Sequence, residues 1–216
     1  MSHDDFDNEP IRGLPQMLPA GEHILWQGAP DWRALAVDSL KVKWVAGYFI
    51  ALFGWRAIVA GAEMSVLQAM AASSFYLVLG AVACSLLALT AWIQAKTAVY
   101  TITNRRVILR IGAALTMTLQ FPFNWIGAAD LVTRSDGTGT IALRTLGETR
   151  FSYLLLWPHL RPWRMARTQP ALRCIPDAAA VARLLAEAVA DAEAMPRVTV
   201  VDSTHDTAGA MPVPAE

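Results

Sequence analysis

A short segment that begins at residue 157 concentrates the side chains best suited to recognising another molecule. It reads WPHLRPWRMAR and combines arginine, tryptophan and histidine. Guanidinium groups bind carboxylates and phosphates through paired hydrogen bonds, and tryptophan is enriched at protein hot spots and at membrane headgroups. We therefore predict that this segment contacts a partner protein or lipid headgroups, through Trp157, His159, Arg161, Trp163, Arg164 and Arg167.

The histidine of this segment allows one further chemistry. An imidazole can ligate the metal of a porphyrin-type pigment, so His159 is a candidate pigment ligand, although an ordinary loop histidine is the interpretation that the sequence favours. The four histidines of the chain show no metal-ligand spacing. Walker, HExxH, CxxC and GxSxG motifs are absent. The sequence therefore predicts a protein that is not an enzyme, with no catalytic residues, no metal and no cofactor.

A long apolar stretch must position this segment. Residues 64–95 contain no Asp, Glu, Lys or Arg, and residues 44–62 contain one charge, Arg56. About 20 apolar residues in a helix cross a hydrocarbon core of roughly 30 Å. The sequence predicts a transmembrane hairpin over residues 44–96, with spans at about 44–62 and 75–93, so the first partner of the chain is a lipid bilayer.

The basic residues orient the hairpin. Lys41 and Lys43 precede the first span and Lys96 follows the second, whereas the connecting turn carries only Glu63. Residues 97–175 hold ten Arg and three acids. Because cytoplasmic loops carry an excess of Lys and Arg, both termini are expected in the cytoplasm. A nucleic-acid partner is disfavoured, because the basic segment is tied close to the bilayer.

Small residues recur four apart in both spans and allow helix backbones to approach closely. They have two interpretations: packing of the spans against each other, which the sequence favours, and docking on a transmembrane helix of another protein. The positions are Gly47, Ala51, Gly80, Cys84 and Ala88.

With the rest of the sequence included, the pattern predicts an α+β membrane protein. Residues 1–20 and 196–216 are expected to be a disordered arm and tail, and residues 21–43 an interfacial segment with a strand at 22–28 and a helix at 30–42. Residues 97–195 are expected to form a domain of short antiparallel strands, closed as a barrel or sandwich and capped by a helix at 177–195. Residues 157–176 fit no regular element. The expected strands are 98–103, 106–111, 115–121, 126–133, 140–146 and 150–157.

Several stretches resemble known proteins. Residues 100–106 (YTITNRR), directly after a predicted span, resemble the start of the bacterial pleckstrin-homology-like (PH-like) domain. A wider pattern covers about residues 11–190 and is similar to the PuhB family of photosynthetic complex assembly proteins of purple bacteria. It comprises residues 13–22 (GLPQMLPAGE), 25–28 (LWQG), 30–33 (PDWR), 100–112 and 156–164 (LWPHLRPWR).

That resemblance implies a function as well as a fold. The fold would be a bent antiparallel barrel closed at one end by a C-terminal helix. The function would be non-enzymatic assistance to assembly of the photosynthetic reaction centre with its core light-harvesting antenna, with self-association into a homodimer. The location would be the bacterial inner membrane, either cytoplasmic or intracytoplasmic. The family has no established catalytic residues to carry over, and Lys41 and Lys43 stand where a more basic segment with a histidine is expected.

Two hypotheses follow. The first is an assembly factor whose hairpin recognises helices of the nascent complex and whose cytoplasmic domain holds a reaction-centre or core-antenna subunit. The alternative is a membrane-tethered PH-like module of an envelope system, which binds anionic lipid or a peptide through Arg161, Arg164 and Arg167.

Overall fold

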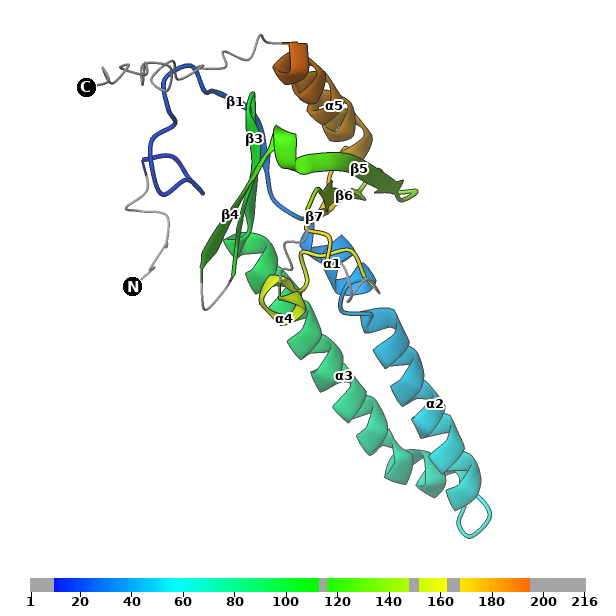
Figure 1. The fold of residues 1–216 in the computed structure, drawn as a ribbon. Coiled ribbons are helices and arrows are strands. Elements are labelled where there is room, and N and C mark those ends of the chain that lie inside the picture. Colours follow the sequence, from blue (N-terminus) through cyan, green and yellow to red (C-terminus); the bar gives the residue numbers. More distant parts are fainter. Residues whose placement is uncertain (1–9, 113–115, 148–151, 163–167, 195–216) are drawn as a thin grey trace, which may run out of the picture.

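In the computed structural model, a helical hairpin projects from a module built of two antiparallel sheets (Figure 1). The structure describes residues 10–112, 116–147, 152–162 and 168–194. This confirms the α+β class, with two long apolar helices and antiparallel strands.

The first sheet joins chain segments from both sides of the hairpin. Its strand order is β1 (Ile24–Gly28), β2 (Val99–Thr103), β3 (Arg106–Ile111) and β4 (Met117–Pro122). β1 precedes the hairpin and pairs with β2, which follows it, so that Gly28 lies opposite Tyr100. The pairing of β1 with β2 therefore closes the base of the hairpin within one sheet.

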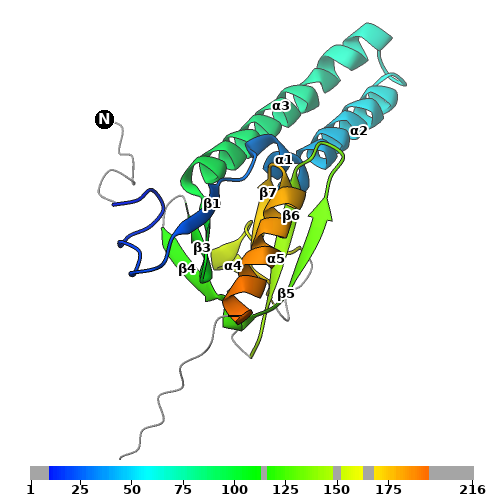
Figure 2. The same ribbon diagram turned by 90° about the horizontal axis from the view of Figure 1, so that it is seen from above.

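The second sheet lies beside a helix. Its order is β5 (Ile126–Thr133), β6 (Gly139–Thr145) and β7 (Ala171–Ile175), and α5 (Ala178–Ala194) packs along it (Figure 2). The 3₁₀ helix η1 (Phe123–Trp125) connects β4 to β5. The expected barrel is corrected here: within the described residues the two sheets share no strand pairing and do not close, since η1 separates β4 from β5 and the strands β1 and β7 are not paired.

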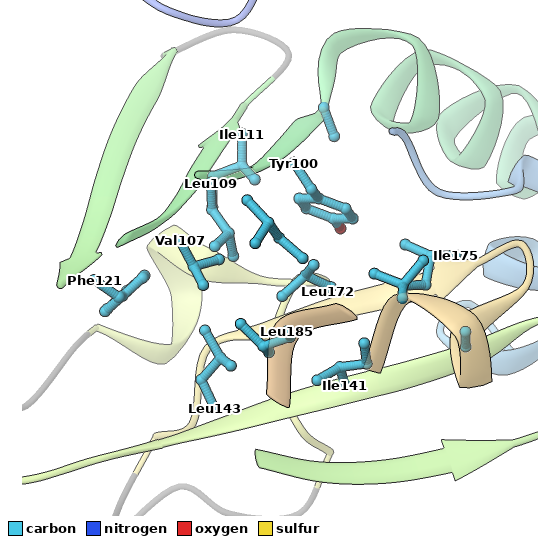
Figure 3. Packing of buried hydrophobic residues seen from close by; sticks show 14 of the residues in the cluster. Tyr100, Val107, Leu109, Ile111, Phe121, Ile141, Leu143, Leu172, Ile175 and Leu185 are labelled. Carbon is cyan, nitrogen blue, oxygen red and sulfur yellow. The ribbon is translucent and has the colours of Figure 1, made fainter. Parts of the chain in front are cut away.

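The core fills the space between the sheets and α5. Side chains of β2 and β3, such as Tyr100 and Leu109, face those of β6, β7 and α5, such as Ile141, Leu172 and Leu185 (Figure 3). All of these are at most 2% exposed. Alternation along β6 and helical spacing along α5 place apolar residues on the inner face of each, as period-two and period-3.6 patterns require.

The hairpin consists of α2 (Val42–Ala60) and α3 (Val66–Thr97), both long and apolar enough to cross a membrane. Gly80 lies against Phe49, and Cys84 Sγ lies 4.0 Å from the carbonyl oxygen of Val42. Since the helices are antiparallel, α2 lies alongside roughly the first 19 residues of α3. The remainder, about 20 Å of helix, runs past the start of α2, where Ala91 packs against α1 (Trp32–Asp38).

The helix α1 has its apolar face inside the protein. Leu35 is fully buried, and Ala34 and Leu35 pack against Cys174 of β7. The backbone N–H of Asp31 also donates to the carbonyl oxygen of Cys174 at 2.8 Å. The helix expected within residues 30–42 is present, but its apolar side is covered by α3 and β7 and is not free to lie on lipid.

Three local expectations were wrong. Residues 150–157 were expected to form a strand, but α4 (Tyr153–Leu156) is helical. Residues 157–176 were expected to be irregular, but they contain β7. Residues 10–20, expected to be disordered, lie against the module, where Leu14 is 3% exposed and the side chain of Gln27 donates to the carbonyl oxygen of Arg12. The expected disorder of 1–9 and 196–216 falls outside the described residues.

Candidate interaction site at the base of the hairpin

Arg173, in the middle of β7, ties three parts of the chain together. Its side chain is 3% exposed. One terminal nitrogen donates to the carbonyl oxygen of Leu160 at 2.7 Å, and the other donates to Asp38 Oδ2 at 2.5 Å and to Ser39 Oγ at 2.7 Å. Asp38 ends α1 and Leu160 follows α4, so the Arg173 guanidinium fixes the entry to the hairpin against the second sheet.

Asp38 is shared among three cations. Besides Arg173, its carboxylate lies 3.6 Å from Arg134 and 3.9 Å from Lys41. We call Asp38, Lys41, Arg134 and Arg173 the junction cluster. One carboxylate faces three basic groups, which leaves a formal excess of two positive charges.

The local sequence explains why these groups meet. Asp31 caps α1 by accepting a hydrogen bond from the backbone N–H of Ala34 at 2.8 Å. The helix ends at Asp38, and Lys41, with φ of 54°, takes the left-handed conformation that redirects the chain into α2. The bend places the Asp38 carboxylate and the Lys41 ammonium on the same side of the chain as β7.

A cavity of about 210 Å³ opens beside this cluster. Asp38, Ser39, Lys41 and Arg173 supply its polar wall, and Tyr153 and Trp157 supply aromatic surface. Pro158, Leu160 and Pro162 complete the lining. The cavity combines a cationic wall with an apolar one, which suits a ligand that carries a negative group next to apolar atoms.

A buried hydrogen bond supports the cluster from behind. Tyr100 Oη lies 2.5 Å from His159 Nδ1, and the backbone N–H of Arg173 donates to Tyr100 Oη at 3.4 Å. His159 is 2% exposed, and burial, followed by the positive charge of Arg173, lowers the pKa of its imidazole to about 3. Burial raises the pKa of the Tyr100 hydroxyl above its usual range. Both groups are therefore neutral at physiological pH.

Comparison with known proteins places the chain in a family. Residues 45–189 match the model of the bacterial PH domain. The chain belongs to the bacterial PH domain family. It is also 46% identical over 190 residues to a protein of Rhodobacter capsulatus named as an uncharacterized 23.7 kDa protein in the puhA 5′ region. That alignment covers 87% of this chain and 89% of the relative. No solved structure matches.

Only some of the predicted contact residues lie in the part of the chain that the structure describes. Trp157 is 41% exposed and lines the cavity. Arg161 forms an ion pair with Asp130 and bonds to Gln169, so its guanidinium is already engaged within the protein. Arg144 and Arg161 lower the pKa of the Asp130 carboxyl by hydrogen bonding to it. Trp163, Arg164 and Arg167 lie outside the described residues.

His159 does not suit the pigment-ligand role. One ring nitrogen is hydrogen-bonded to Tyr100, and a side chain that is 2% exposed leaves no approach for a flat macrocycle. The sequence interpretation missed Asp38, Tyr100 and Arg173. A charged residue inside the apolar run ALRCI was the one available signal, because a charge within such a run demands a partner.

The predicted helix-packing residues divide into two groups. A Cβ added to Gly80 would lie 2.6 Å from Phe49 Cβ, and Cys84 lies against the start of α2, so both stand at the contact between α2 and α3. Ala88 is half-buried. Gly47 and Ala51 are exposed, and a Cβ added to Gly47 would meet nothing within 4 Å. Their face of α2 is therefore left uncovered by the described residues.

Proposed function

We propose that the protein is a non-enzymatic assembly factor for the photosynthetic reaction centre and its core light-harvesting complex. In this proposal the α2–α3 hairpin lies in the bacterial inner membrane and both termini lie in the cytoplasm. The observation that carries the proposal is the 46% identity, over most of both chains, to a protein named for its position in the puhA region. That position hints at a function related to photosynthesis.

The hairpin supplies the surface for recognising other membrane helices. All residues of α2 are described, and only Ala60 among them is buried. Trp55 and Ile58 are 71% and 76% exposed, so most of the helix remains available to neighbours. Helices associate within a bilayer mainly by close packing, for which Gly47 and Ala51 offer a smooth face. We propose that this face contacts helices of reaction-centre or core-antenna subunits.

The module supplies rigidity. A helix that continues directly into β2, and a buried arginine that holds the end of α1, fix the hairpin relative to the sheets. A subunit held by the cytoplasmic module would therefore be held at a defined place relative to the hairpin. This is a positioning role and requires no catalysis.

Deleting the gene in the source bacterium tests the proposal. We expect lower near-infrared absorbance of the reaction centre and core antenna, restored by the full chain. A chimera in which an unrelated hairpin replaces residues 42–97 should not restore it, although its module still accumulates in the membrane. Unchanged spectra and unchanged photosynthetic growth after deletion would rule the proposal out.

Topology is tested separately with single cysteines in a Cys84→Ala, Cys174→Ala background. A membrane-impermeant maleimide added to intact spheroplasts should label a cysteine at Glu63, in the turn, and should not label one at Arg183 on α5. Labelling at Arg183 alone would reverse the proposed orientation.

A further inference from the structure

The cavity beside the junction cluster lies where a membrane surface must lie if α2 crosses the bilayer. Lys41 and Lys43 flank the first residue of α2, and Trp44 is 79% exposed. Charged residues at a helix end stay at the headgroups, and tryptophan favours the same depth. Because Lys41 lines the cavity, the cavity stands at headgroup level.

The charge at the cavity is unbalanced toward positive. Asp38 is the one carboxylate of the junction cluster, and it is shared by Lys41, Arg134 and Arg173. The Lys41 side chain is 52% exposed, and its ammonium lies 3.9 Å from the Asp38 carboxylate. At this distance the N–H groups of the ammonium remain available to a further acceptor. Among the residues that line the cavity, Lys41 and Arg173 carry two positive charges against the one negative charge of Asp38, so a single negative charge bound here would restore neutrality.

Arg173 adds an independent indication. It is 3% exposed, and its Nε is a buried nitrogen with no hydrogen-bond partner among the described residues. Buried donors of this kind are almost always satisfied in proteins, by the chain itself or by a bound species. Arg173 contributes to the cavity wall, so a species bound in the cavity is one source of such an acceptor.

We propose that this cavity binds the phosphate of an anionic phospholipid headgroup, with Lys41 and Arg173 facing the phosphate. Tyr153 and Trp157 line the same cavity and offer apolar surface to the glycerol and the upper acyl chain. A phospholipid, rather than a soluble phosphate ester, fits this combination of a cationic and an apolar wall at headgroup depth. The inference rests on the membrane placement of the hairpin and not on which subunits the protein assists.

The test measures lipid binding to the full chain in mild detergent. Native mass spectrometry would follow titrations with phosphatidylglycerol and with phosphatidylcholine. We expect the first phosphatidylglycerol to bind about fivefold or more tightly than phosphatidylcholine, since one basic group near a headgroup is worth about that factor. Lys41→Asn should remove this preference, because asparagine tolerates positive φ and lacks the charge.

Lys43→Asn is the matched control, since Lys43 stands at the same depth and does not line the cavity. This variant should keep the preference. Three results would overturn the proposal: equal binding of both lipids to the unaltered chain, equal losses in both lysine variants, or displacement of the lipid by millimolar glycerol 1-phosphate. The last result would assign the cavity to a soluble phosphate ester. Whether or not the lipid binds as expected, the absorbance spectra of the deletion strain remain a separate test of the assembly function.

Discussion

The hairpin and the two-sheet module treat their apolar side chains in opposite ways. All five residues of β2 are buried, whereas Ala60 alone is buried in α2. Both segments contain Val, Ile and Tyr, yet β2 is enclosed by the protein, whereas α2 is covered only along the face that packs against α3. An apolar helix face that no protein covers is typical of a segment surrounded by lipid or by other membrane helices. The difference shows that composition alone describes neither region without its surroundings.

The largest expected difference between the two regions comes from substituting isoleucine in each of them. Ile141→Ala, at 0% exposure in β6, should lower the free energy of unfolding by about 3 kcal/mol, because a cavity replaces close-packed atoms. Ile58→Ala, at 76% exposure in α2, should change it by less than about 0.5 kcal/mol. Guanidinium denaturation of the full chain in mild detergent, followed by near-ultraviolet circular dichroism, measures both. Equal losses would mean that the Ile58 side chain is packed within the protein and is not exposed.

The second prediction concerns Arg173, the buried arginine of the junction cluster that links the hairpin to the module. Arg173→Met keeps an unbranched apolar stem but leaves Asp38 and the Leu160 carbonyl without their buried donor, and should cost about 3 kcal/mol. Arg144→Met is the control, because Arg144 pairs with Asp130 while 58% exposed, and exposed pairs contribute at most about 1 kcal/mol. The same denaturation experiment applies. Similar effects of both changes would show that burial of Arg173 adds nothing to the junction.

The sequence predicted the module better than it predicted the junction. Alternation or β-branched residues located β1 to β6, and helical spacing located α5, because these patterns are local. β7 was missed because its five residues lie between Pro170 and Pro176 and carry Arg173 at their centre, which breaks the apolar run. The closed barrel was wrong because sheet closure depends on pairing between distant strands, which no local pattern encodes.

The candidate site was missed for a similar reason. Arg173 and Asp38 are 135 residues apart in the chain, and nothing in the sequence around either residue identifies the other. The predicted segment pointed to the right part of the molecule, since Trp157 lines the cavity, but the prediction did not name Arg173, the buried arginine that holds this part of the structure together. Ion pairs between residues far apart in the sequence can be identified only once the fold is known.

The third prediction concerns His159, the buried neutral histidine next to the junction cluster. The pKa of His159 is about 3 in the folded protein and about 6.5 in an unfolded chain. Between these values the unfolded chain binds a proton that the folded protein does not, so stability falls as pH falls. From pH 7 to pH 5 the loss should be about 2 kcal/mol. His159→Gln, which can still accept from Tyr100, should lose little over this range. Equal stability of the unaltered chain at both pH values would contradict the buried neutral state.

The smallest expected effect returns to the hairpin and separates its two faces. A Cβ at position 80 would lie 2.6 Å from Phe49 Cβ, so Gly80→Ala should force α2 and α3 apart and cost about 1–2 kcal/mol. Gly47→Ala meets open space and should leave the hairpin as stable as before. Titration with sodium dodecyl sulfate in mixed micelles measures the midpoint of hairpin dissociation. If Gly47→Ala keeps that midpoint but lowers reaction-centre absorbance in cells, the open face of α2 contacts a partner helix. If it changes neither, that face contacts only lipid, and the recognition proposed for the hairpin must lie elsewhere on its surface.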